Sequence, residues 1–131
     1  MPTRTKQVVV VRRDLRLRRA EAAAYVARAS IQFFAALATP GDNQIMSIGL
    51  SEEEQEWFDG EGTVIVLGVQ SEGALQAIIT RSEIQGLTVH TLSKNRSDDD
   101  KSEETSTLVC VAIGPHDEDS IDAITAKLKL F

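Results

Sequence analysis

The sequence has few of the residues that mark disulfide-bonded, metal-binding and membrane proteins. Cys110 is the single cysteine among 131 residues, which excludes an intramolecular disulfide and a CxxC zinc pair. The two histidines, His90 and His116, lie far apart with no cysteine or carboxylate at ligand spacing, so we expect no metal site. No stretch approaches the roughly 20 apolar residues that cross a bilayer. Residues 1–6 lead into a strand pattern instead of a secretory signal, so we expect a cytoplasmic protein without a membrane partner.

Glycine-rich phosphate loops are absent as well. Neither GxGxxG nor GxxxxGK(S/T) follows the first predicted strand, and Gly60-Glu61-Gly62 precedes a strand instead of following one. This context argues against a nucleotide-binding α/β protein. What is present is an ordinary globular composition, with 42% hydrophobic and 26% charged residues, and a length typical of a single domain spanning 1–131.

The charge is unevenly distributed along the chain. The net charge of −6 would argue against a nucleic-acid partner. However, residues 1–28 contain eight basic and two acidic side chains, a net charge of +6, whereas residues 29–131 carry −12. A separated basic segment of this kind is either a local phosphate-binding surface or a solvated charged face.

The pattern of apolar residues predicts alternating strands and helices. The run at 7–12 is continuously β-branched, which is typical of a central strand covered on both faces. By spacing and capping residues we expect helices at 20–37, 51–58, 74–82 and 118–127, strands at 63–69, 87–92 and 107–113, and a polar loop at 93–106. This order predicts a three-layer α/β/α fold with a four-stranded, mostly parallel sheet. The last two strands have no helix between them and can pair antiparallel, which would make the sheet mixed.

Two segments resemble a known family. The stretch from Lys6 to Leu15, KQVVVVRRDL, is followed by a basic turn and an alanine-rich helix, and the chain closes with AIGP at 112–115 and LKLF at 128–131. In this order they resemble the start and end of type 2 peptidyl-tRNA hydrolases. The resemblance implies a compact α/β/α fold with a four-stranded mixed sheet, often dimeric, so a homodimer is one expected assembly. It also implies hydrolysis of the ester joining a peptide to the ribose of tRNA, without a metal or organic cofactor.

The resemblance also suggests which helix residues bind and act on tRNA. Laid ungapped from Asp14, the family's basic helix start is kept in kind at Arg16 and Arg19, while its active-site lysine falls on Glu21. The family's glutamine and histidine fall on Tyr25 and Arg28. The expected tRNA-binding residues are Arg16, Arg18, Arg19, Tyr25 and Arg28.

The family's second motif, Asp-Ala-Gly-Arg-Thr, is harder to locate. Counting forward from Gly86 puts its aspartate at Lys94, whereas counting back from Gly114 puts it at Ser97. Asp98 could occupy the role. The hydroxyl residue that opens the family's fourth strand is kept as Thr107. The expected catalytic residues are therefore Glu21 or Asp98 to order water, and Thr107 to aid positioning.

Two functional hypotheses follow. The first is a divergent peptidyl-tRNA hydrolase that binds tRNA through the basic segment 12–28. The second is a non-catalytic RNA- or protein-binding module on the same scaffold. The second is motivated by Glu21, because a carboxylate in place of the family's lysine would repel both the oxyanion and nearby phosphate. At ~4 Å and an effective dielectric near 20, one such charge pair is worth about 4 kcal/mol.

Overall fold

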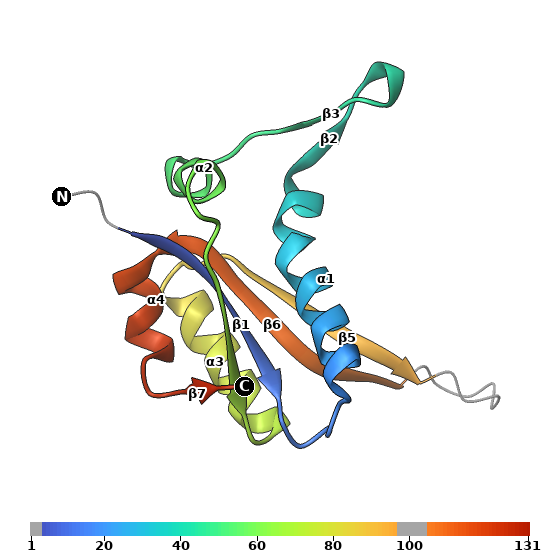
Figure 1. Ribbon diagram of the computed structural model, residues 1–131, viewed down its shortest axis with the longest axis vertical. Coiled ribbons are helices and arrows are strands. Elements are labelled where there is room, and N and C mark those ends of the chain that lie inside the picture. The colour runs from blue at the N-terminus through green and yellow to red at the C-terminus, as the bar shows by residue number, and fades with distance from the viewer. Residues whose placement is uncertain (1–3, 97–104) are drawn as a thin grey trace.

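The computed structural model describes residues 4–96 and 105–131, which form one layered α/β unit (Figure 1). The main sheet is built from β1 (Thr5–Arg12), β4 (Val64–Val69), β5 (Val89–Arg96), β6 (Thr105–Asp117) and β7 (Lys129–Leu130). The helices are α1 (Arg19–Leu37), α2 (Glu52–Asp59), α3 (Glu72–Ile84) and α4 (Glu118–Thr125). A hairpin of β2 (Ala38–Pro40) and β3 (Met46–Ile48) encloses a short 3-10 turn (Asp42–Gln44) and projects from the body. Within the described residues, no helix is long and apolar enough to span a membrane.

The sheet is mixed, as expected, but it is larger and less parallel than the sequence pattern predicted. Its strand order is β5-β6-β1-β4-β7. Only β1 and β4 pair in parallel, whereas β1–β6, β5–β6 and β4–β7 pair antiparallel. The prediction of four strands was wrong by one, because the two-residue β7 is too short to have a detectable period. The prediction of a mostly parallel sheet was also wrong.

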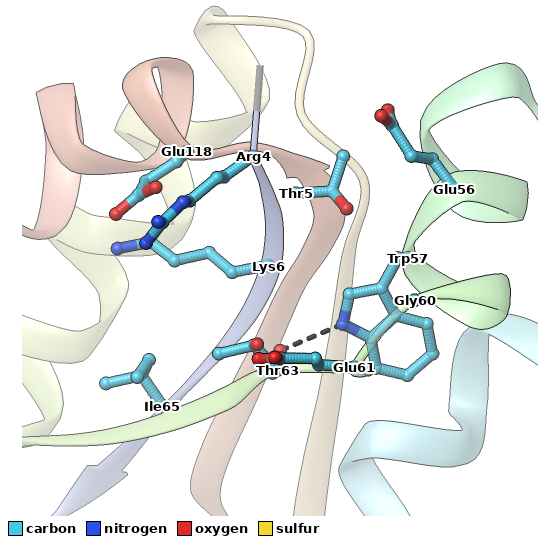
Figure 2. Close-up of a pocket in the computed structure, with 11 residues that line it drawn as sticks. Arg4, Thr5, Lys6, Glu56, Trp57, Gly60, Glu61, Thr63, Ile65 and Glu118 are labelled. Atoms are coloured by element: carbon cyan, nitrogen blue, oxygen red, sulfur yellow. Dashed lines mark hydrogen bonds between the residues drawn. The ribbon is translucent and has the colours of Figure 1, made fainter. Parts of the chain in front are cut away.

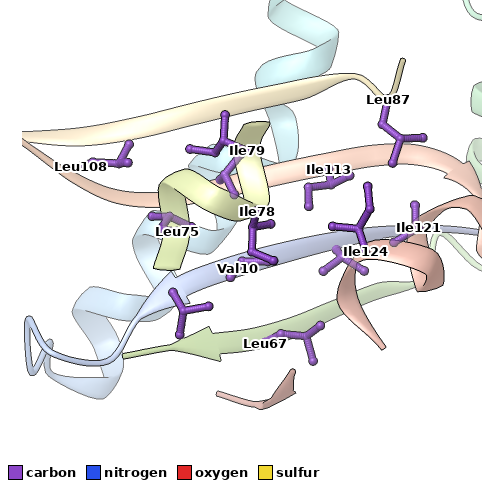
Figure 3. Close-up of a cluster of buried hydrophobic side chains, with 13 residues drawn as sticks. Val10, Leu67, Leu75, Ile78, Ile79, Leu87, Leu108, Ile113, Ile121 and Ile124 are labelled. Carbon is purple, nitrogen blue, oxygen red and sulfur yellow. The ribbon is translucent and has the colours of Figure 1, made fainter. Parts of the chain in front are cut away.

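The central strand is covered on both faces, as its continuous apolar run predicted. Val8, Val9, Val10 and Val11 are all 0% exposed. Val8 and Val10 pack with α3 and α4 in one cluster, drawn in Figure 3, and Val9 and Val11 pack toward α1 in the other. Successive side chains of a strand point to opposite faces, so one run of valines fills two cores.

Aromatic residues join α1 to α2. Phe33 is fully buried in α1, and its ring meets the ring of Trp57 edge-on with centroids 5.6 Å apart. The Trp57 indole N–H donates to the Thr63 carbonyl at 2.8 Å, which ties α2 to the start of β4. The predicted capping box of α2 is confirmed, since Ser51 and Glu54 exchange side-chain-to-backbone hydrogen bonds.

The polar segment 93–106 is only partly a loop. β5 continues to Arg96 and β6 begins at Thr105, so both strands extend into the region where the sequence predicted a loop. In Figure 1 these strand ends extend to the edge of the body, where polar side chains can be solvated on a strand. Asp98 lies outside the described residues.

Candidate active site

The first turns of α1 meet the paired ends of β5 and β6, and this junction brings together two of the predicted catalytic residues (Figure 1). Lys94 of β5 is directly opposite Thr107 of β6 in the antiparallel register. The Lys94 Nζ lies 3.3 Å from Oε2 of Glu21 in the first turn of α1. Residues directly opposite in a sheet point to the same face, so Thr107 is on the α1 face with Lys94. Glu21, Lys94 and Thr107 form what we call the junction cluster.

The junction cluster is open to solvent. The Lys94 side chain is 51% exposed and that of Glu21 is 37% exposed, while Thr107 is partly buried. Each ionic side chain therefore retains hydrogen-bonding capacity toward a bound molecule.

Arg12 anchors this part of the sheet. Its Nη1 donates to the Leu108 carbonyl at 2.9 Å, while Nε and Nη2 donate to the two carboxylate oxygens of Asp14 at 3.0 and 2.7 Å. The hydrogen bond to Asp14 raises the pKa of Arg12, and the same bond lowers the pKa of Asp14. Because Leu108 follows Thr107, the buried Arg12 links the start of β6 to the loop that leads into α1.

The basic residues predicted to bind phosphate lie in that loop and at the start of α1. Arg16, Arg18 and Arg19 are all exposed, and none forms an ion pair within residues 4–96 and 105–131. Arg16 has a φ of 51°, in the left-handed region that non-glycine residues adopt infrequently. Its N–H donates to the Arg13 carbonyl at 3.1 Å, so this conformation belongs to a hydrogen-bonded turn.

The other two predicted tRNA contacts differ in exposure. Arg28 is exposed on α1. Tyr25 is partly buried and packs against the hydrophobic cluster on the α1 face. The Tyr25 ring therefore contributes to the core as well as to the surface, whereas the Arg28 guanidinium is available to solvent.

Lys94 is the member of the junction cluster that sequence reasoning did not choose. Counting forward from Gly86 places the family's aspartate at this position, whereas Asp98 is the carboxylate predicted for that role. The signal that could have identified Lys94 is its charge. A lysine at the expected aspartate position, together with a glutamate at the expected lysine position, indicates an exchanged ion pair.

Cys110 and His90, which have no predicted role in the site, are both shielded from solvent to some degree. Cys110 is buried, and burial raises the pKa of its thiol to about 12, so it is not a nucleophile. Burial also lowers the pKa of His90. Across the described residues, no group of three or more histidine, cysteine, aspartate or glutamate side chains is placed to hold a metal ion.

A cavity of about 440 Å³ lies at the opposite end of the sheet (Figure 2). It is lined by Thr5 and Lys6 at the start of β1 and by Trp57 of α2. Several of its polar groups already have partners, because Lys6 pairs with Asp122 at 2.6 Å and the Trp57 N–H is bonded to Thr63. None of the predicted site residues lines this cavity, so the junction cluster is the better candidate for the active site.

Comparison with known proteins places this chain in a family. The family model described as Peptidyl-tRNA hydrolase PTH2 matches residues 5–131. The chain belongs to the peptidyl-tRNA hydrolase PTH2 family. A peptidyl-tRNA hydrolase of Haloquadratum walsbyi is 32% identical to it over 126 residues, which cover 96% of this chain and 99% of the relative. A peptidyl-tRNA hydrolase of Methanococcus maripaludis is 31% identical, and the match covers 95% of this chain and 97% of the relative. One of Thermoplasma acidophilum is 28% identical with the same coverage. The junction cluster therefore lies within a chain that matches these hydrolases along almost its whole length.

Proposed function

We propose that this chain hydrolyses the ester bond of peptidyl-tRNA at the junction cluster. The observation that carries the proposal is the meeting of Glu21, Lys94 and Thr107 beside an exposed basic loop. This arrangement puts an acid, a cation and a hydroxyl next to a surface suited to phosphate. The family and its full-length relatives support peptidyl-tRNA as the substrate class.

The reaction needs an activated water and stabilisation of the oxyanion. The water oxygen attacks the ester carbonyl carbon, and the bond from that carbon to the ribose oxygen breaks. The ribose oxygen gains a proton, so that tRNA leaves with a free hydroxyl and the peptide leaves as a carboxylate. Glu21 or Asp98 orders the water, and Thr107 positions the ester.

The tRNA is held through its phosphates by exposed arginines at the start of α1. Arg16, Arg18 and Arg19 lie on one continuous segment before and within the first turn, and Arg28 lies further along the same helix. Such contacts release counterions, so affinity falls steeply with salt. Tyr25 adds a ring near this surface on which a base can stack.

The direct test is release of peptide from a purified peptidyl-tRNA, measured against a reaction without protein. We expect release by the wild type and a loss of at least tenfold in Thr107→Val. The matched control is Thr91→Val, because Thr91 lies on the same hairpin but pairs with Val111, whose side chain faces the α3–α4 core. Absence of peptide release by the wild type would refute the hydrolase assignment.

The tRNA surface is tested separately with Arg16→Asn. Asparagine tolerates the left-handed conformation, so this change removes the cation while leaving the turn intact. Binding of tRNA is titrated at two salt concentrations. We expect weaker binding and a shallower salt dependence for the variant, with a slope reduced by about one phosphate contact, roughly 0.7–0.9 in the log–log plot. An unchanged slope would remove Arg16 from the tRNA surface.

A non-catalytic binding module is the second candidate function. The observation in its favour is that Glu21 and Lys94 neutralise each other, which leaves neither charge unpaired for chemistry. Salt-dependent tRNA binding without peptide release would support this alternative. Peptide release that depends on Thr107 would exclude it.

A further inference from the structure

We propose that Lys94 is the catalytic cation of the site and that Glu21 is a positioning residue that orients it. This inference rests on the proposed hydrolase function. The ion pair is then the reverse of the pattern the family resemblance implies, with the lysine on strand β5 and the carboxylate on helix α1.

The first argument is the number of donors that Lys94 retains. An ammonium group has three N–H donors and no acceptor. In the described residues, Lys94 Nζ has one partner, Oε2 of Glu21 at 3.3 Å. With half of its side chain exposed, the ammonium can donate to a second acceptor without first leaving Glu21. A developing oxyanion is such an acceptor, and a fixed cation beside it lowers the barrier to its formation.

The second argument is the position of Lys94 relative to Thr107. The two residues are directly opposite each other in the sheet, and opposed residues have Cβ atoms roughly 4.5–5.5 Å apart on one face. A carbonyl held near the Thr107 hydroxyl is therefore within reach of the flexible lysine. Arg12 donates a buried hydrogen bond to the carbonyl of the next residue, Leu108, which supports the backbone position of Thr107 on β6.

The third argument is that the ion pair has little structural value. Exposed salt bridges contribute little to stability because water solvates both charges well. Glu21 is 37% exposed and Lys94 is 51% exposed. The hairpin and helix already have their own apolar contacts, since Leu92 and Val109 are buried against the α1 face. Glu21 can therefore orient the ammonium through this contact in addition to the water-ordering role proposed above.

A charge-exchange experiment tests the inference, using peptide release from peptidyl-tRNA with kcat and KM separated. We expect Lys94→Met to lower kcat at least tenfold and to change KM by less than threefold, and Lys94→Arg to recover part of kcat. Glu21→Gln should lower kcat by a smaller factor, and Glu21→Asp should recover most of the loss. The control is Lys127→Met, because Lys127 is exposed beyond α4 on the opposite face.

The double variant Glu21→Lys/Lys94→Glu tests whether the site needs opposite charges at positions 21 and 94. If it does, the double variant should be at least fivefold more active than Glu21→Lys alone, in which two cations face each other. An active wild type with kcat unchanged in Lys94→Met would overturn this inference and leave the hydrolase assignment in place. An inactive wild type would overturn both. Fluorescence of Trp57 at rising urea verifies that each variant is folded.

Discussion

Replacing Arg12 should show how the fold supports the junction cluster. Arg12 is 8% exposed and makes three hydrogen bonds, two to Asp14 and one to the Leu108 carbonyl. Asp14 is exposed, so water can replace the arginine there. Leu108 is 9% exposed, and Arg12→Met would remove a charged donor from its carbonyl. A hydrogen bond to a charged group is worth about 1.5–3 kcal/mol, and we expect the free energy of unfolding to fall by that amount.

Urea unfolding followed by tryptophan fluorescence is the appropriate assay. Trp57 is the single tryptophan and is 8% exposed, so its emission reports global unfolding. Arg12→Lys serves as the graded control, because lysine keeps the charge but lacks the planar fork that bonds two groups at once. The expected order of stability is wild type, then Arg12→Lys, then Arg12→Met. The same order is expected for kcat, since Leu108 adjoins Thr107.

The variant Asp14→Asn separates the effect of the Arg12–Asp14 hydrogen bonds from that of the Arg12–Leu108 hydrogen bond. If the bond to Leu108 dominates, Asp14→Asn should be clearly less destabilising than Arg12→Met. Equal losses in the two variants would mean that the arginine acts through Asp14, and the reasoning above would be wrong. A free energy of unfolding for Arg12→Met within about 0.5 kcal/mol of the wild type, the range of ordinary surface changes, would also refute it.

Three further outcomes follow from buried or capping groups. Phe33→Ala removes a fully buried ring that contacts Trp57 and should cost about 3–5 kcal/mol in urea unfolding. Cys110 should react with a thiol reagent at pH 8 only after unfolding, because burial raises its pKa to about 12. Asp117→Ala should cost about 1 kcal/mol at pH 7, since Asp117 caps α4. Hydrogen bonds from Ser120 lower the pKa of Asp117, so this stabilisation is present above the ordinary value of 3.8 and is lost as the pH falls below it.

The helices and the buried middle of each long strand could be predicted from the sequence, whereas the shortest strands could not. The valine run of β1 and the alanine-rich α1 were predicted to within a residue or two. The two strands of the projecting hairpin have three residues each, and β7 has two. Such segments are paired by tertiary structure, and their side chains carry no alternation that a pattern search can detect.

Strand direction depended on information that is not local. A helix between two predicted strands favours a parallel crossover, and β1 and β4 do pair that way. The sheet nevertheless became mainly antiparallel because β6 inserts between β5 and β1. The position of β6 is decided by the packing of the whole sheet.

Glu21 and Thr107 of the junction cluster could be predicted and Lys94 could not, and the common face of the three residues depends on a β-bulge. Glu21 follows from a simple count along one helix. On β6, Val109 and Cys110 both pack toward α1, whereas Leu108 packs toward α3 and α4. Plain alternation from Cys110 would have put Thr107 on the wrong face of the sheet. The irregular register beside Leu92 returns Thr107 to the α1 face, opposite Lys94.

The separation of charge explains why an acidic chain can still have a phosphate-binding end. The exposed acidic residues of α2 border the start of β1, because Glu56 and Thr5 line the same cavity. The basic loop begins at the other end of this 8-residue strand, which at roughly 3.3 Å per residue spans about 26 Å. Ionic screening at physiological salt acts over about 8 Å. Phosphates near Arg16 therefore experience the local positive charge, and the net charge of −6 has little influence on them.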